Sequence, residues 1–332
     1  MCYKKGVHGE PFSKMKQDID TARAAELVQK LIANVASAFV GKNDVVQRTV
    51  LTLISGGHAL LEDVPGVGKT LLARALAKSI SADFKRVQFT ADLLPSDVTG
   101  VTTFNQERHD FVFRPGPIFA NILLCDEINR ANPRTQSSLL EAMEEGNVTV
   151  DGVPYALPSP FFVIATQNPV ELEGTYPLPF AQMDRFMCRL SIGYMDRGAE
   201  MQMLRLQQSA APLANIAKVM DLTMLTAIQR RVRQVRIEES LVGYIVDIIQ
   251  TTRRSEAIEY GSSPRGSLDL QGYSQALALL AGREFVLPDD IKQSARYILP
   301  HRLIVRRGAH NAAPESEAII EQLLGTIAVP TI

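Results

Sequence analysis

The sequence predicts an α/β fold in which a parallel β-sheet is sandwiched by helices and followed by a smaller all-α domain. Two observations predict this fold. Short apolar runs of strand length alternate with helical segments as far as about residue 195, and only helical segments follow. The length of 332 residues also fits two domains of about 150 residues each. We therefore expect an α/β domain over residues 17–195 and a helical domain over residues 196–332.

The N-terminal region predicts an arm followed by two helices. Residues 1–16 mix charged residues with Gly and Pro and lack the apolar core of a signal peptide, so we expect a disordered arm. Residues 20–39 carry apolar side chains at helical spacing. A break at residues 41–44 separates this helix from a second apolar helix, which ends at Gly56 and Gly57.

The central region predicts the strands of the sheet. Several of the expected strands are short apolar runs, as strands buried on both faces of a parallel sheet require. The expected strands are 58–62, 84–89, 121–125, 161–165 and 186–190, and the helices between them include 70–81 and 135–145. This alternation predicts parallel pairing with helices on both faces.

Two hairpins interrupt the alternation, and helices alone follow it. Residues 101–118 contain two β-like runs around a polar stretch, and residues 148–155 alternate around an Asp-Gly turn. The second half of the chain predicts helices over residues 241–254, 267–281, 288–299 and 315–324. We expect these helices to form a small bundle.

Composition argues against several classes of protein. Hydrophobic residues make up 46% of the chain and charged residues 21%, as in ordinary globular domains, and no apolar run is long enough to span a bilayer. The net charge of −1 gives no global attraction to nucleic acid, although the basic run 230–236 is a local exception that is more typical of a solvated helix face or a subunit contact. Three scattered cysteines argue against a zinc site or a disulfide framework and predict a cytoplasmic protein.

A glycine-rich segment between an expected strand and an expected helix predicts a phosphate-binding loop, or P-loop. It reads Glu62-Asp63-Val64-Pro65-Gly66-Val67-Gly68-Lys69-Thr70. Gly66 and Gly68 let backbone N–H groups turn toward phosphate oxygens, and the following helix points its positive dipole end at the same anion. Lys69 is expected to reach the β- and γ-phosphates, and Thr70 to offer its hydroxyl to Mg²⁺. Asp63 replaces the first glycine of the usual G-x-x-x-x-G-K-[ST] pattern, and we expect it to tolerate a left-handed backbone there.

Polar side chains follow two of the buried strands. Asp126 is expected to hold Mg²⁺ and Glu127 to polarise the attacking water, because a buried strand that ends in adjacent carboxylates is costly unless a cation lies there. Asn168 ends the next buried strand, where it either contacts the γ-phosphate and the water or caps the turn before Pro169. Since ligands of parallel sheets bind at the carboxyl ends of the strands, these residues predict a site for ATP hydrolysis to ADP.

Six motifs in order resemble the MoxR family of AAA+ ATPases, in the clade with a helix-2 insert. They are 60–70 (LLEDVPGVGKT), 125–131 (CDEINRA), 165–169 (ATQNP), 174–179 (GTYPLP), 184–186 (DRF) and 263–265 (SPR). The resemblance extends over roughly residues 20–325. It implies a P-loop NTPase sheet with an all-α lid, assembled as a hexameric ring. The hairpins 101–118 and 148–155 resemble the helix-2 insert and the pre-sensor-1 hairpin, which would face the central channel of that ring.

The resemblance also implies roles for single residues. Asn168 falls at the sensor-1 position, and Arg265 falls at the sensor-2 position. Arg185 falls at the position of an arginine finger, which reaches the γ-phosphate of a neighbouring subunit, while Arg130 and Arg134 are rival candidates for that role. The expected contacts of ATP or ADP are Val40 and Gly41 at adenine, with Pro65, Gly66, Val67, Gly68, Lys69, Thr70 and Leu71 in the loop.

The leading hypothesis is a ring-forming ATPase that remodels or activates a protein partner. The MoxR family implies it, because its members act as chaperone-like maturation factors, often with von Willebrand factor A domain proteins. A nucleotide-gated binding module is an alternative, although Glu127 argues against it because binding alone needs no base. A nucleic-acid motor is disfavoured by the net charge of −1, and a chelatase-type subunit would differ only in its partner.

Overall fold

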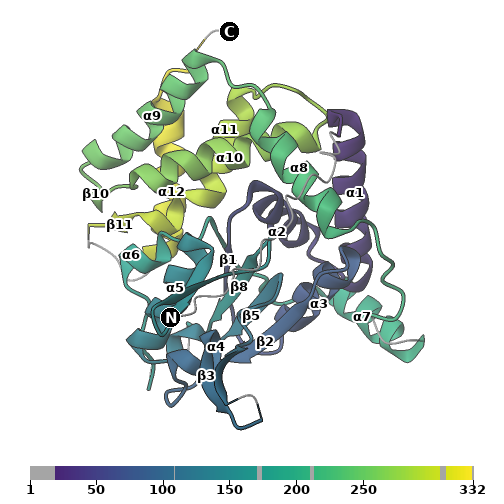
Figure 1. Ribbon diagram of the computed structural model, residues 1–332. Helices are drawn as coiled ribbons and strands as arrows, with labels where there is room; N and C mark the ends of the chain where they lie inside the picture. The colour runs from purple at the N-terminus through teal and green to yellow at the C-terminus, as the bar shows by residue number, and fades with distance from the viewer. Residues whose placement is uncertain (1–18, 108, 170–173, 210–212, 307–311, 331–332) are drawn as a thin grey trace.

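A five-stranded parallel sheet forms the centre of the protein, in the order β2-β5-β8-β1-β9. The computed structural model describes residues 19–107, 109–169, 174–209, 213–306 and 312–330 (Figure 1). The strands are β1 (Ala59–Glu62), β2 (Phe84–Gln88), β5 (Ile122–Asp126), β8 (Phe162–Gln167) and β9 (Cys188–Leu190). Each overlaps a run predicted as a strand, so the predicted parallel sheet is confirmed. The expected arm 1–16 lies outside the described residues.

Both faces of the sheet are buried at its centre, which explains why β5 and β8 are largely apolar, whereas the edge strand β2 carries exposed polar side chains. In β5, Ile122 and Leu124 belong to one hydrophobic cluster, whereas Leu123 and Cys125 belong to another. Successive side chains of a strand point to opposite faces, so the two clusters lie on opposite sides of the sheet. The first cluster includes α1 (Thr21–Ala38), α2 (Asn43–Ser55) and α3 (Lys69–Ser79), and the second includes α5 (Pro133–Glu145).

Two antiparallel hairpins leave the sheet, as predicted. One pairs β3 (Gly100–Asn105) with β4 (Asp110–Pro115), and the other pairs β6 (Asn147–Val150) with β7 (Val153–Ala156). The prediction omitted three short helices, α4 (Pro95–Thr99), η1 (Ile128–Arg130) and α6 (Phe180–Met183). Helices this short carry too few residues for a periodic pattern.

The second half of the chain is helical with one small exception. Its helices are α7 (Arg197–Ser209), α8 (Leu222–Gln234), α9 (Glu239–Arg254), α10 (Pro264–Leu280), α11 (Pro288–Ile298) and α12 (Ala312–Thr326), with η2 (Pro300–Arg302) after α11. The expectation that strands stop near residue 195 is wrong, because β10 (Ile258–Tyr260) and β11 (Ile304–Val305) pair antiparallel. These strands are too short to show alternation in the sequence. Within the basic run 230–236, Arg231 donates to Thr21 of α1 and pairs with Glu284 at 2.6 Å.

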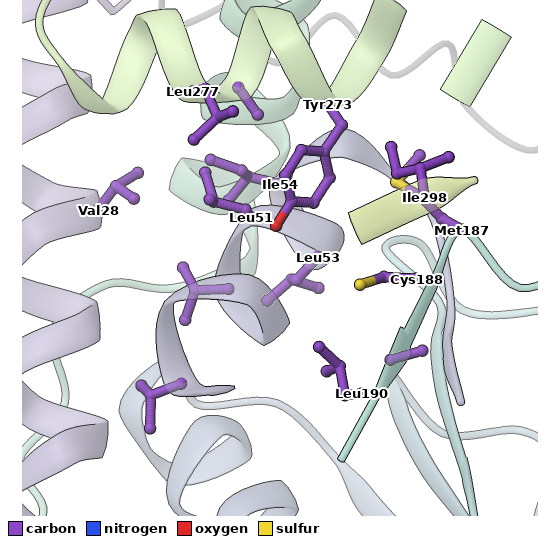
Figure 2. Close-up of a cluster of buried hydrophobic side chains, with 14 of the residues drawn as sticks. Val28, Leu51, Leu53, Ile54, Met187, Cys188, Leu190, Tyr273, Leu277 and Ile298 are labelled. Carbon is purple, nitrogen blue, oxygen red and sulfur yellow. The ribbon is translucent and has the colours of Figure 1, made fainter. Parts of the chain in front are cut away.

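The helical half shares a hydrophobic core with one face of the sheet. Figure 2 shows Tyr273 and Leu277 of α10 close to Leu51 and Ile54 of α2, with Cys188 of β9 nearby. α2 therefore packs between the sheet and α10. Within the described residues, no helix is both long enough and apolar enough to cross a membrane.

His58 and the two described cysteines pack in the interior. Nδ1 of His58 accepts a hydrogen bond from the Val163 backbone N–H at 3.1 Å, and Nε2 lies 3.3 Å from the Met143 carbonyl. Burial lowers the pKa of His58 to about 4, so the imidazole is neutral near pH 7. Burial also raises the pKa of the Cys188 thiol to about 12, and Cys125 shifts in the same direction. Both thiols are therefore small apolar packing groups.

A buried ion cluster fastens the helical half to the sheet. The Arg302 side chain is 0% exposed, and its Nε lies 3.3 Å from Oδ1 of Asp184. Nη2 of Arg302 also donates to the Phe186 carbonyl at 2.9 Å and to the Asp269 carboxylate. Burial raises the pKa of Asp269, while the Arg302 guanidinium opposes that rise. The cluster joins η2 and α10 to the segment that follows α6.

The first prediction concerns this cluster. Arg302→Ala is expected to lower the free energy of unfolding by about 3–5 kcal/mol, because it leaves buried carboxylates without a counter-charge. The control is Arg296→Ala, which removes an ion pair to Glu321 whose side chains are 43% and 53% exposed. Such exposed pairs contribute about 0–1 kcal/mol. Urea unfolding measures both changes, and equal losses would contradict a special role for Arg302.

Candidate functional site

The P-loop connects β1 to α3 in the conformation that its glycines allow. Gly66 and Gly68 have φ angles of +87° and +95°, in the left-handed region that other residues rarely adopt. A Cβ at Gly68 would also lie 3.0 Å from the Phe39 ring, whereas one at Gly66 would meet no atom within 4 Å. Gly66 is therefore required for its backbone angle, and the space beside it is open to a ligand.

Asp63 replaces the first glycine of the pattern for a reason other than the expected one. Its backbone is not among the left-handed residues, so that position needs no glycine. The buried carboxylate instead accepts hydrogen bonds from the backbone N–H groups of Ile192 and Gly193 and, at 3.3 Å, from the Ser191 hydroxyl. Asp63 therefore ties the start of the P-loop to the segment after β9.

A cavity of about 450 Å³ opens at the carboxyl edge of the sheet. It brings together the expected phosphate, metal and water residues, with two further side chains from β2. Its lining is Pro65, Gly66, Gly68, Lys69, Thr70, Leu71, Arg86, Gln88, Asp126, Glu127 and Asn168. Lys69 Nζ donates to the Asp63 carbonyl at 2.6 Å, and burial lowers the Lys69 pKa while nearby carboxylates oppose that change.

Asp126 is held by neighbours on both sides. Its Oδ1 accepts a hydrogen bond from the Thr166 hydroxyl at 2.7 Å, and its Oδ2 accepts one from Arg86 Nη2 at 2.6 Å. Thr70 also lines the cavity, so a carboxylate and a hydroxyl face the same space. In the described part of the chain, no group of three or more His, Cys, Asp or Glu side chains is arranged to hold a metal. The donors fit Mg²⁺, which binds through one or two protein oxygens with substrate phosphates.

Glu127 is oriented by three side chains. Its backbone is left-handed, with φ +56°, and its N–H donates to the Thr166 hydroxyl at 2.9 Å. Its Oε2 accepts from Gln88 Nε2 at 2.6 Å and from Arg130 Nη1 at 3.0 Å. A non-glycine residue at positive φ stores backbone strain, which is common at functional sites. Sequence reasoning missed Arg86 and Gln88, whose only local signal is that polar residues alternate with Val87 along an edge strand.

Val40 and Gly41 do not line this cavity, but they lie close to a second one. A second cavity of about 220 Å³ shares Pro65 and Gly66 with the first, and its other lining residues are Val67, Gly193, Tyr194, Met195, Glu200 and Met203. A Cβ on Gly41 would overlap Ala199, so the glycine allows α7 to pack there. This mainly apolar pocket next to the phosphate cavity has the chemistry that a nucleobase needs. The sequence did not single out its tyrosine and methionines.

Arg185 and Arg265 lie at the opposite edge of the sheet. They line a third cavity, of about 170 Å³, with Gly57 and His58, the residues that immediately precede β1. The P-loop immediately follows β1, whose 4 residues extend about 13 Å at about 3.3 Å per residue. The two arginines are therefore separated by the length of β1 from the phosphate cavity of their own chain.

Acidic side chains hold the two arginines beside each other. Arg185 Nη2 lies 3.2 Å from Oε2 of Glu144, and Arg265 pairs with Oε1 of the same carboxylate. Arg265 Nη1 also lies 3.8 Å from Asp184, which accepts a hydrogen bond from the Ser263 hydroxyl at 2.8 Å. Arg185 therefore pairs with an acid, and the same acid also joins it to Arg265.

Comparison with known proteins identifies the family. Residues 58–188 match the ATPase family associated with various cellular activities (AAA), and residues 250–323 match the AAA lid domain. The chain is 37% identical over 320 residues to chaperone MoxR1 of Mycobacterium tuberculosis, covering 93% of this chain and 84% of that protein. The chain belongs to the MoxR family of AAA+ ATPases.

The chain is also similar to a second protein and to a solved structure over nearly its whole length. The chain is 50% identical over 304 residues to the uncharacterized protein YeaC of Bacillus subtilis (strain 168), covering 92% of this chain and 95% of that protein. A crystal structure of a candidate ATPase from Cytophaga hutchinsonii superposes with a TM-score of 0.86 at 38% identity, covering 94% of this chain and 97% of that chain. The predicted P-loop sheet with an all-α lid is thus confirmed for this MoxR-family protein.

The second prediction concerns the P-loop aspartate. Asp63→Gly restores the usual glycine, yet it is expected to lower the free energy of unfolding by about 1–3 kcal/mol, because buried N–H groups lose their acceptor. Asp63→Asn keeps one acceptor oxygen and is expected to lose less. Urea unfolding of both variants measures the effect. A glycine variant as stable as the unmodified protein would contradict the anchoring role.

Proposed function

We propose that this MoxR-family protein hydrolyses ATP with Mg²⁺ at sites shared between neighbouring subunits of a hexameric ring in the cytoplasm. Hydrolysis would drive chaperone-like remodelling or activation of a protein partner. The observation that carries the proposal is that the P-loop and the pair Arg185 and Arg265 lie at opposite ends of β1. The P-loop follows the strand, whereas Arg185 and Arg265 lie beside the residues that precede it.

Within one subunit, the phosphate cavity supplies the groups that bind ATP. Lys69 would move from the Asp63 carbonyl to the β- and γ-phosphates, which offer it a stronger, charged acceptor. Thr70 and Asp126 would hold Mg²⁺, with the Thr166 hydroxyl fixing the rotamer of Asp126. Bound Mg²⁺ would supply positive charge at the phosphates during transfer. The nucleobase would occupy the neighbouring apolar pocket, with Val40 and Gly41 behind it.

Glu127 would act as the base that polarises the attacking water. Gln88 and Arg130 hold its carboxylate, and Thr166 holds its backbone, so its position in the cavity is defined. Asn168 lies in the wall of the same cavity and would orient the water or contact the γ-phosphate. Since Arg130 lies beside Glu127 at the phosphate cavity of its own chain, whereas Arg185 lies at the far edge of the sheet, we favour Arg185 over Arg130 as the arginine finger.

The neighbouring subunit would supply the remaining positive charge. An arginine that stabilises the γ-phosphate in transfer is worth about 10³–10⁵ in rate. Arg185 and Arg265 form one cationic pair, so we propose that both act on the nucleotide of the adjacent subunit. A closed ring would give every site such a pair, because head-to-tail interfaces repeat around a ring.

The hairpin β3–β4 offers an apolar surface to a client. Phe104 and Phe111 face each other across it with ring centroids 5.3 Å apart, and they are 52% and 69% exposed. Exposed aromatic pairs are typical of protein-binding surfaces. We propose that this hairpin contacts the protein partner, for which a von Willebrand factor A domain protein is the leading candidate.

The third prediction tests turnover. The steady-state ATPase rate per protomer, with Mg²⁺, is expected to rise with protein concentration, because each site needs a neighbour. Lys69→Ala and Glu127→Gln are each expected to lower that rate by about 10²-fold or more, through loss of phosphate binding and of the base. A wild-type rate as low as that of both variants, with ATP bound, would favour a nucleotide-gated binding module instead.

The fourth prediction tests the shared site. Lys69→Ala subunits bind no ATP but keep their arginines, whereas Arg185→Ala subunits keep an intact phosphate cavity. Each variant alone is expected to be inactive, and a mixture is expected to recover part of the wild-type rate, since one variant supplies the arginine and the other the nucleotide. No recovery in the mixture would contradict an arginine supplied by the neighbour. Full activity of Arg185→Ala alone would do the same.

A further inference from the structure

We propose that Glu144 is a positioning residue for hydrolysis in the adjacent subunit, where it holds Arg185 and Arg265 together as a two-arginine unit. The inference rests on the proposed function, since it concerns the arginines that would reach across the interface. Glu144 lies in the last turn of α5, away from the phosphate cavity of its own chain.

One carboxylate serves two guanidinium groups. Oε2 of Glu144 faces Arg185 at 3.2 Å, and Oε1 faces Arg265. The arginines come from different parts of the chain, because Arg185 follows α6 and Arg265 is in the first turn of α10. Glu144 therefore fixes the separation of two groups whose backbones belong to the sheet and to the lid.

Electrostatics explains why a carboxylate is needed between them. Two guanidinium groups that contact the same carboxylate lie close enough to repel each other. The negative charge of that carboxylate attracts both and offsets the repulsion. Each contact uses one terminal nitrogen of a guanidinium that carries five N–H donors, so donors remain for a phosphate. The carboxylates around the unit balance its charge, and a γ-phosphate, which carries more negative charge than one carboxylate, would compete with Glu144 for the free donors.

The exposure of these side chains argues against a mainly structural role. The side chains of Arg185, Arg265 and Glu144 are 30%, 34% and 40% exposed, so water screens their interactions. Such pairs contribute little to the stability of the fold. The buried Arg302 cluster instead holds the lid helices against the sheet domain. We therefore assign Glu144 the role of orienting the side chains of Arg185 and Arg265.

The fifth prediction uses Glu144→Gln, with Glu141→Gln, an exposed glutamate one turn earlier on the same helix, as the matched control. Glu144→Gln is expected to lower kcat about tenfold, which corresponds to about 1.4 kcal/mol. The affinity of its own site for a fluorescent ADP analogue and its urea midpoint are expected to stay unchanged. Glu141→Gln is expected to match the unmodified protein in all three measurements. A rise in kcat would overturn the proposal, because Glu144 would then restrain the arginines rather than position them.

Mixed subunits separate a positioning role from a general defect. In the mixture of Lys69→Ala and Arg185→Ala subunits, Glu144→Gln is added to one partner at a time. Added to the Lys69→Ala subunit, which donates the arginines, it is expected to lower the recovered rate about tenfold. Added to the Arg185→Ala subunit, it is expected to change nothing.

Two outcomes separate failure of this inference from failure of the proposed function. A parent mixture that recovers no activity would overturn the shared site, and the role of Glu144 with it. If the parent mixture recovers activity and adding Glu144→Gln to either subunit leaves that recovered rate unchanged, the role of Glu144 alone would be overturned. A lower urea midpoint for Glu144→Gln, with equal loss in both positions, would make it a structural residue.

Discussion

The buried guanidinium of Arg302 is the constraint on which the arrangement of the two halves depends. A fully buried charge is tolerated only when it is paired and hydrogen-bonded, and here the partners are Asp184, Asp269 and the Phe186 carbonyl. Asp184 and Phe186 flank Arg185, and Asp269 lies one turn after Arg265 on α10. The cluster therefore brings the end of α6 and the start of α10 together, and Arg185 and Arg265 become neighbours as a consequence.

A second link lies at the other end of β1, within the sheet domain, and holds the P-loop to the segment that leads into the lid. The Asp63 carboxylate accepts hydrogen bonds from backbone groups at the end of β9, just before the chain enters α7. The strand β1 is thus tied to the segment leading into the lid at its P-loop end and, through the Arg302 cluster, to the lid near its start.

Charge balance organises the phosphate cavity before any ligand arrives. Asp126 is paired with Arg86, and Glu127 with Gln88 and Arg130, so neither carboxylate faces its neighbour without a donor. Adjacent carboxylates would otherwise repel each other and favour protonation. The arginine pair at the far edge is balanced in the same way by Glu144. Both halves of the proposed shared site therefore rest in a compensated state, and the phosphates of ATP would meet oriented donors on both sides of the proposed interface.

The sequence by itself determined the elements and the local chemistry. Strand-length runs between helical segments identified all five strands, and contiguous motifs identified Lys69, Thr70, Asp126 and Glu127, because the residues that form a P-loop or a strand end are neighbours in the chain. Only the tertiary structure decided which distant side chains complete them. Asp63 meets the backbone N–H of Gly193, Arg86 meets Asp126, and Glu144 meets Arg265, across 130, 40 and 121 positions. No local pattern encodes such partners, since each depends on how strands order in the sheet and how the lid docks on it.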